Sequence, residues 1–152
     1  MIKFNRGVPS IFRFAVFLLL FAMSNQLHSA SNDRLVMVIS NQASLTALSN
    51  KELRRIYLGL TVKKSGEIIT PVRNHTHDDL HEVFLQKVMF MSSRTYERQL
   101  NLRTIKKGIK PPTQFEKEED ILQYLENNPN MVSYMWESKA KDYSNLRVLD
   151  IN

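Results

Sequence analysis

The sequence predicts an α/β fold in a single domain, preceded by a short leader. Two observations lead to this prediction. A strand-like apolar run, an amphipathic helix and a second strand-like run follow one another between residues 35 and 72, and this order begins an α/β layer. No internal repeat, low-complexity segment or long linker divides the chain after residue 30, and about 120 residues suffice for one hydrophobic core.

The first thirty residues have the composition of a secretory signal peptide. Lys3, Arg6 and Arg13 form a positive leader without an acid, and residues 14–21 (FAVFLLLF) form an apolar core too short to cross a bilayer comfortably. Small residues suited to cleavage lie between positions 24 and 31. We therefore expect residues 1–30 to direct export to the periplasm and residues 31–152 to form the mature domain. An uncleaved membrane anchor is the alternative.

Charge and cysteine content exclude several classes of function. Removing the leader leaves 18 basic residues against 15 acids, a net charge of about +3 that is ordinary for a small soluble domain. The chain after residue 30 contains no basic stripe with interleaved aromatic residues, so we expect no nucleic-acid partner. The absence of cysteine excludes disulfides, thiolate metal sites and a cysteine nucleophile.

The first half of the mature chain carries the clearest local signals. Residues 35–39 (LVMVI) are a continuous apolar run, typical of a strand buried on both faces. Ser49 and Glu52 are spaced as a capping box, and Gly59 is placed to end the helix that they begin. A turn at residues 65–66 then leads to a second strand at 68–72, with Pro71 at an edge or an end.

Further helices and strands are expected in the second half. One helix begins at Thr76 or Asp78 and buries a stripe that includes Val83 and Phe84, with His77 and His81 away from its centre. A short helix follows Ser92 or Ser93 through residue 100, and another begins in the acidic run 116–120. Two strands, at residues 131–136 and 146–151, close the chain.

The residue identities in the capped helix are more specific than its apolar pattern. Residues 48–59 resemble the Leu-Ser-x-x-Glu-Leu-x-x-Ile-Phe-x-Gly signature of the phosphate ABC transporter substrate-binding protein family, with Tyr57 where that family usually has Phe. Residues 71–72, Phe84, the Pro pair at 111–112 and residues 128–134 also match family segments in order. The resemblance spans roughly residues 33–152.

This resemblance implies a type II periplasmic binding-protein-like fold with a central mixed sheet flanked by helices in three layers. The family's usual protein has two such lobes closing on an anion, and this chain is long enough for one, with the motifs of the second lobe. Half a cleft cannot engulf a small anion such as phosphate, so tight capture would require a second copy in a homodimer, or another partner.

The expected anion site departs from the family pattern. In the family a Ser/Gly turn at a helix N-terminus offers backbone N–H groups to phosphate, with an Arg one turn later. Here His77 and Asp78 stand at that turn and His81 stands where the Arg would be, and the carboxylates of Asp78 and Asp79 would repel an anion. Gly is also missing at Asn130 and Ser133.

Three of the four histidines, His75, His77 and His81, lie within seven residues. His77 and His81 at i, i+4 could share one helix face and hold a divalent metal with Asp78, although a solvated polar helix start explains the same residues. No catalytic set is recognisable, so we expect no enzyme and no cofactor.

The leading hypothesis is an exported solute-binding-type domain that binds a small ligand weakly or through a partner. The alternatives are a periplasmic interaction module that reports to a membrane sensor or transporter without a tight ligand, and metal binding by the histidines. The predicted ligand-binding residues are Asn41, Ser44, Thr76, His77, Asp78 and His81.

Overall fold

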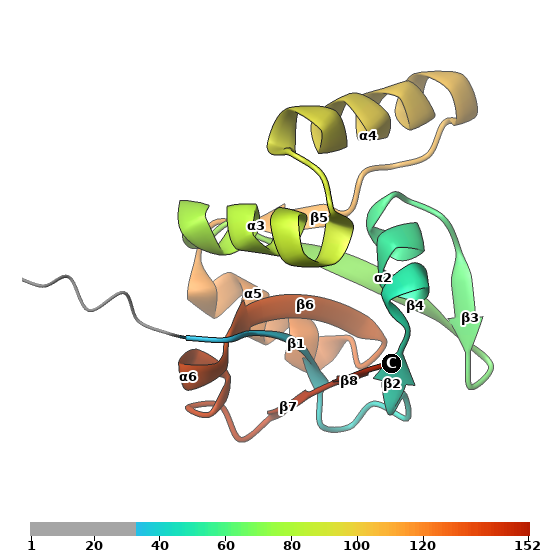
Figure 1. The fold of residues 1–152 in the computed structure, drawn as a ribbon. Coiled ribbons are helices and arrows are strands. Elements are labelled where there is room, and N and C mark those ends of the chain that lie inside the picture. Colours follow the sequence, from blue (N-terminus) through green and yellow to red (C-terminus); the bar gives the residue numbers. More distant parts are fainter. Residues whose placement is uncertain (1–32) are drawn as a thin grey trace, which may run out of the picture. The chain divides into compact units, whose positions relative to one another are not determined.

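The computed structural model describes residues 33–152, and the predicted leader, residues 1–30, lies outside the described part of the chain. A mixed sheet forms its centre, with the order β3-β4-β6-β1-β7 and with β5 beside β4 (Figure 1). The strands of this sheet are β1 (Leu35–Ser40), β3 (Val62–Lys64), β4 (Glu67–Asn74), β5 (Thr113–Phe115), β6 (Met131–Trp136) and β7 (Leu146–Val148). Strands β5 and β6 are both parallel to β4, whereas β1 is antiparallel to β6. A small second sheet pairs β2 (Ala47–Leu48) with β8 (Asp150–Ile151).

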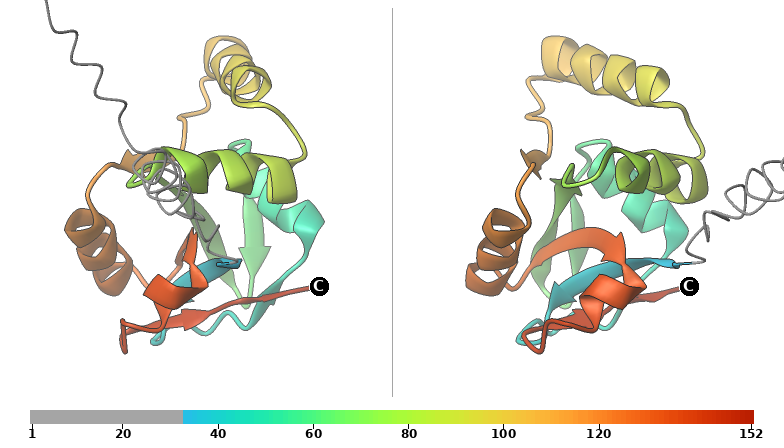
Figure 2. Two further views of the ribbon diagram at one scale, coloured as in Figure 1. Left: turned by 60° about the vertical axis from the view of Figure 1, so that its left-hand side comes forward. Right: turned by 90° about the vertical axis from the view of Figure 1, so that its left-hand side faces the viewer.

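Helices cover both faces of the main sheet, and both views of Figure 2 separate the two groups. One face carries α2 (Asn50–Tyr57), α3 (Asp78–Phe84), the π-helical turn η1 (Leu85–Met89) and α4 (Ser93–Lys107). The other face carries α5 (Glu118–Asn127) and α6 (Glu137–Ala140). The predicted three-layer α/β fold with a central mixed sheet is therefore confirmed.

Strand β1 shows why the sheet is buried on both sides. Met37 and Ile39 belong to the core under α2 and α3, while Val36 and Val38 belong to the core under α5. Successive side chains of a strand point to opposite faces, so a continuous apolar run supplies both cores. This is the arrangement that the run at residues 35–39 predicts.

Helix α2 has the predicted ends. The backbone N–H of Glu52 donates to Ser49 Oγ at 3.2 Å, and the N–H of Ser49 donates to Glu52 Oε2 at 2.8 Å, which completes the capping box. Gly59 has a φ of +77° and ends the helix. The helix therefore holds Tyr57 in the core with no exposed surface.

Strands β4 and β6 are joined by two kinds of hydrogen bond. Their backbone pairing covers only Thr70 with Met131 and Pro71 with Val132. Side chains add further bonds, which are Tyr57 Oη to Val72 O and to Val132 O (3.1 Å each), Ser133 Oγ to Val72 O (3.1 Å) and Asn74 Nδ2 to Tyr134 O (2.9 Å). Buried carbonyl groups need such partners.

Pro71 was expected at an edge or an end, and the structure places it inside β4. Strand β3 pairs with residues 67–69 and β5 pairs with residues 72–74, which leaves Pro71 in the interval between them. A proline has no N–H to donate, so the interval tolerates it. Pro71 is therefore not at an end of β4, and it lies where one side of the strand has no partner among residues 33–152, as at an edge.

Two other elements differ from expectation. The strand predicted at residues 146–151 is divided at Leu149, whose side chain is buried in the core. Before this residue β7 pairs with β1, and after it β8 pairs with β2. Helix α4 begins at the predicted cap, where the N–H of Thr95 donates to Ser92 Oγ at 3.3 Å. It continues past residue 100 to Lys107, and Gly108 with a φ of +63° ends it.

Candidate functional site

The ends of three strands define the candidate site. Because β4, β5 and β6 run parallel, their last residues, Asn74, Phe115 and Trp136, come to one edge of the sheet. Ligands of open α/β sheets bind outside the carboxyl ends of the strands. We call these strand ends, together with the loop 75–77 that follows β4, the strand-end edge.

Asn74 fixes the loop that follows β4. Its side chain is 2% exposed, and its Oδ1 accepts hydrogen bonds from Thr76 N at 3.0 Å and from Thr76 Oγ1 at 2.7 Å. Its Nδ2 donates to Tyr134 O on β6. Both donors of Thr76, a predicted ligand-binding residue, are therefore directed toward Asn74.

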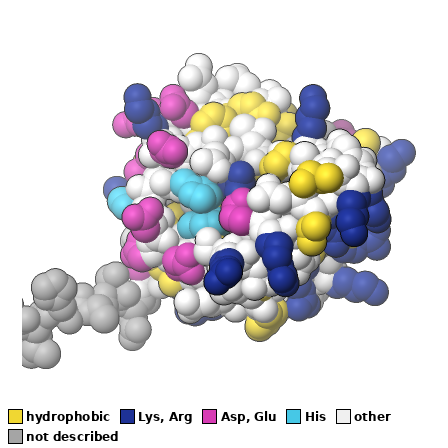
Figure 3. All heavy atoms as spheres, turned by 90° about the horizontal axis from the view of Figure 1, so that it is seen from above, with side chains coloured by type: hydrophobic (Ala, Val, Ile, Leu, Met, Phe, Trp, Pro, Cys, Tyr) yellow, Lys and Arg dark blue, Asp and Glu magenta, His cyan; other side chains and the backbone are white. Residues whose placement is uncertain are grey.

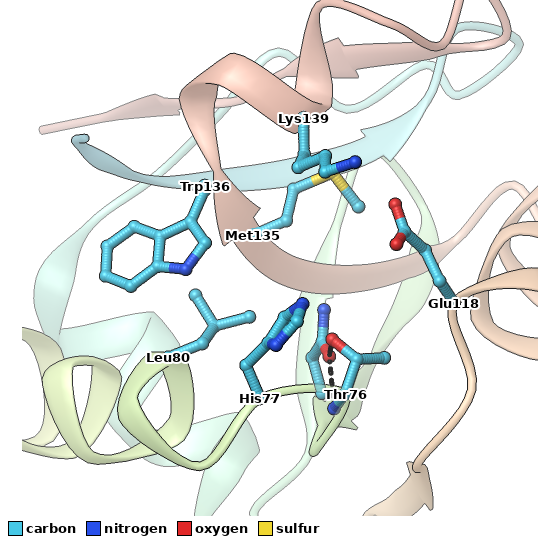
Figure 4. Close-up of a pocket in the computed structure, with 8 residues that line it drawn as sticks. Thr76, His77, Leu80, Glu118, Met135, Trp136 and Lys139 are labelled. Carbon is cyan, nitrogen blue, oxygen red and sulfur yellow. Dashed lines mark hydrogen bonds between the residues drawn. The ribbon is translucent and has the colours of Figure 1, made fainter. Parts of the chain in front are cut away.

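A small cavity lies at the strand-end edge. Figure 4 shows side chains from the loop, α3, α5, β6 and α6 converging on it. Its lining residues are Asn74, Thr76, His77, Leu80, Glu118, Met135, Trp136 and Lys139. The volume of about 10 Å³ is close to the minimum that holds one water molecule. A phosphate ion does not fit this cavity as it stands.

Glu118 lines the cavity, and further carboxylates lie in the first turns of two of the helices that contribute to it. Asp78 and Asp79 are exposed in the first turn of α3, and α5 begins with Glu118, Glu119 and Asp120. Acids at helix N-termini stabilise the helices. They also give the strand-end edge a negative potential, which opposes the binding of an anion.

Arg73 is a buried cation next to the strand-end edge, and it already has a partner. Its Nη1 lies 2.8 Å from Glu97 Oε1 on α4, and its Nε donates to Pro112 O at 3.4 Å. The side chain is only 10% exposed. Arg73 is not predictable as a site residue from the sequence, because an arginine near the end of a strand carries no signal until α4 is placed beside it.

His81 corrects one sequence-based expectation. His81 is only 5% exposed, whereas Val83 is half-buried. The buried face of α3 and η1 therefore combines His81 with Leu80, Phe84, Leu85, Val88 and Met89. The stripe is rotated toward His81 because Nδ1 of its ring shares a 2.7 Å hydrogen bond with Tyr134 Oη. His81 therefore packs inside the domain instead of facing a ligand.

The ring of His75 packs against that of His81 in a tilted arrangement, with ring centroids 4.0 Å apart. Within residues 33–152 neither Nε2 atom of the pair has a hydrogen-bond partner. Burial, with contributions from His75 and Arg73, lowers the pKa of His81 to about 4. Burial also lowers the pKa of His75, with Arg73 adding to the effect. Both rings are therefore neutral at pH 7.

The structure does not bring His77 and His81 together as metal ligands. His77 is exposed before α3 and lines the cavity, whereas His81 points into the core. In the described part of the chain no three His, Asp or Glu side chains are grouped so that they could hold a metal ion. The i, i+4 spacing of His77 and His81 suggested a metal site, but the two rings do not lie on one exposed face.

The six predicted ligand-binding residues occupy two ends of the sheet. Thr76, His77 and Asp78 lie at the strand-end edge, with His81 buried beneath them. Asn41 and Ser44 follow β1, which runs antiparallel to β6, so they lie at the opposite end. Asn41 donates from Nδ2 to Ser144 O at 3.0 Å. One small ligand cannot contact both groups.

The comparisons with known proteins concern the fold. No protein-family model matches the chain, and none of the curated proteins matches it in sequence. The structure of PstS from Borrelia burgdorferi matches with a TM-score of 0.56 at 15% identity, over 79% of this chain and 47% of that one. A protein described as a phosphate ABC transporter substrate-binding protein, from Clostridium perfringens and with bound phosphate, matches with a TM-score of 0.56 at 14% identity, over 78% and 45%.

A protein from Planctomyces limnophilus, described as a possible phosphate binding protein, matches with a TM-score of 0.53 at 16% identity, over 79% of this chain and 42% of that one. This chain therefore spans about half the length of the solved proteins that it matches. The domain has the fold of about one lobe of phosphate-binding proteins, which confirms the fold inferred from the signature helix. No helix within residues 33–152 is long and apolar enough to cross a membrane.

Proposed function

We propose that this chain is an exported, single-lobe domain of the solute-binding type that acts through a protein partner and does not capture phosphate alone. The observation that carries the proposal is the strand-end edge, which has a water-sized cavity lined by Glu118 and carboxylates in the first turns of α3 and α5. The Clostridium perfringens protein with bound phosphate is about twice as long as the part that matches this chain. A lone lobe leaves any small ligand open to water on one side.

The side chains at the edge support a partner better than a free anion. Lys139 is the cation among the cavity-lining residues, and Glu118 lines the same cavity. An anion bound there would lose water and gain one cation against several carboxylates, which is a poor exchange. A protein surface can instead cover the whole edge and place its own cations opposite Asp78 and Asp79. A membrane transporter or sensor is the proposed partner class, and a second copy is the alternative.

Calorimetric titration with inorganic phosphate tests whether the protein is a phosphate receptor by itself. We expect no saturable heat at micromolar phosphate, because the cavity does not fit the ion. Saturable binding at micromolar phosphate would overturn the proposal. Retention of that binding in Lys139→Ala would place the phosphate elsewhere, whereas its loss would place the phosphate at the strand-end edge.

Site-specific cross-linking tests the partner. A photo-reactive residue at exposed His77 should give a discrete adduct with a transporter or sensor in cells, whereas the same residue at exposed Lys63 on β3 serves as the matched control. Equal adducts from both positions, or none from His77, would contradict a partner at this edge. An adduct with a second copy would establish the homodimer instead.

Export is part of the proposal. The predicted leader, residues 1–30, should be removed during secretion to the periplasm, with cleavage between residues 24 and 31. Cell fractionation with mass spectrometry of the N-terminus measures both. Recovery of the full-length chain in the cytoplasm would contradict export, and recovery of it in the membrane would support the anchor alternative.

A further inference from the structure

Helix α4 carries an exposed stripe that is separate from the strand-end edge. Arg94, Arg98, Leu102 and Lys106 recur every four residues and are all exposed, and Ile105 lies beside them. Residues four apart lie on one face of a helix. Ile105 is 82% exposed and Leu102 is 47% exposed. Two large apolar side chains thus stand in water among cations.

The buried contacts of α4 lie in its first half. Tyr96 donates from its hydroxyl to Tyr57 O at 2.8 Å, Glu97 pairs with Arg73, and Leu100 is buried. After Leu100 no residue of α4 is buried. Figure 1 shows the helix standing apart from the sheet. The second half of α4 contributes no side chain to the core, so the positions of Leu102 and Ile105 are not explained by packing.

Helix α4 carries far more basic than acidic residues. Its basic residues are Arg94, Arg98, Arg103, Lys106 and Lys107. Glu97 is its only acid, and Glu97 is already paired with Arg73. On the face drawn in Figure 3, most Lys and Arg side chains gather on one half and most Asp, Glu and His side chains on the other. This separation would orient the molecule in an electric field.

We propose that α4 docks on a membrane surface that carries acidic phospholipid headgroups. Basic side chains near such a surface are attracted by its negative potential. Arginine and lysine can hold their charge at the headgroups while their stems, with Leu102 and Ile105, lie against the acyl boundary. A flat lipid surface suits a convex helix, whereas the anchoring residues of protein interfaces fill well-packed pockets. The carboxylates of α3 and α5 at the strand-end edge would be repelled by the same headgroups.

Flotation with lipid vesicles tests the proposal on the protein as purified from cells, with its N-terminus defined by mass spectrometry. One vesicle contains equal parts of phosphatidylcholine and phosphatidylglycerol, and the other contains phosphatidylcholine alone. The second vesicle measures any binding through the N-terminal residues. We expect binding to the acidic vesicle that exceeds binding to the neutral one and weakens with added salt.

The decisive variant is Arg94→Glu with Arg98→Glu, which should weaken binding to the acidic vesicle at least about tenfold. Its matched control is Lys51→Glu with Lys63→Glu, exposed residues on α2 and β3 that change the net charge equally. The control should retain more than half of the binding, and Ile105→Ser should bind more weakly than the unaltered protein. Equal binding to both vesicles, or equal losses in the two charge variants, would overturn the proposal. Circular dichroism spectra confirm that each variant is folded.

Discussion

Removing the hydroxyl of Tyr57 tests the link between strands β4 and β6. Tyr57 is fully buried, and its Oη lies 3.1 Å from both Val72 O and Val132 O. Ser133 Oγ also donates to Val72 O. Tyr57→Phe keeps the ring and its packing, and it leaves Val132 O without this donor. Val72 O retains Ser133.

The expected cost follows from this arrangement. A buried hydrogen bond contributes about 0.5–1.5 kcal/mol net, and a stranded buried acceptor costs about 1–3 kcal/mol. We expect Tyr57→Phe to lower the free energy of unfolding by about 1–2 kcal/mol and Ser133→Ala by about 1 kcal/mol. In the double variant Val72 O loses both donors, so the loss should exceed the added single losses by about 1 kcal/mol.

Urea unfolding followed by circular dichroism measures these differences, with the m-value expected to stay constant. Tyr124→Phe is the control, because Tyr124 is half-buried and its hydroxyl makes no hydrogen bond among residues 33–152. It should change stability by less than about 0.5 kcal/mol. The reasoning is refuted if Tyr57→Phe is as harmless as the control, or if the two single losses merely add.

Three further predictions concern stability at acid pH, glycine substitutions in the backbone and the effect of metal ions on the melting temperature. Because the pKa of His81 is about 4 in the folded domain against an ordinary value of 6.5, the unfolded chain binds the proton first. Stability is then lost as pH falls from about 6.5 to 4, by up to about 3 kcal/mol in urea unfolding, and His81→Leu should flatten this slope. Gly59→Ala should destabilise the domain more than Gly66→Ala, since both have positive φ but only at Gly59 would the added Cβ lie 2.4 Å from Ile109 Cγ2. In an Ile109→Ala background the difference in stability between the two glycine variants should become smaller. An unchanged difference would contradict the contact between residue 59 and Ile109. Zinc and nickel should leave the melting temperature at neutral pH unmoved, and a rise of several degrees that is lost in His77→Ala would revive the metal hypothesis.

Local chemistry made part of the fold predictable. The capping box of Ser49 and Glu52 depends only on neighbours within one turn, and the structure contains both of its hydrogen bonds. The apolar run at residues 35–39 likewise requires burial on both faces wherever it is placed. These signals are strong because few alternative structures satisfy them.

The features that the sequence could not predict depend on the direction of strands and on contacts between residues far apart in the chain. That β1 runs antiparallel to β6 is set by the whole sheet, and it alone separates Asn41 and Ser44 from the strand-end edge. The rotation of α3 that buries His81 is set by Tyr134, which lies 53 residues away. The far end of α4 was missed because helical spacing was sought in buried residues, and residues 101–107 bury none.

Side-chain hydrogen bonds connect the end of β4 with β6 and with the loop that follows β4. The resemblance described from the sequence implies Phe at the position of Tyr57 and Gly at that of Ser133, and in this chain both hydroxyls donate to Val72 O. Asn74 continues the connection by donating to Tyr134 O, and its Oδ1 accepts from Thr76 N. An anion at a helix N-terminus depends on free backbone N–H groups. At this edge the backbone N–H of Thr76 is already used inside the protein, because it donates to Asn74 Oδ1, so we expect that this donor is not free to bind an anion.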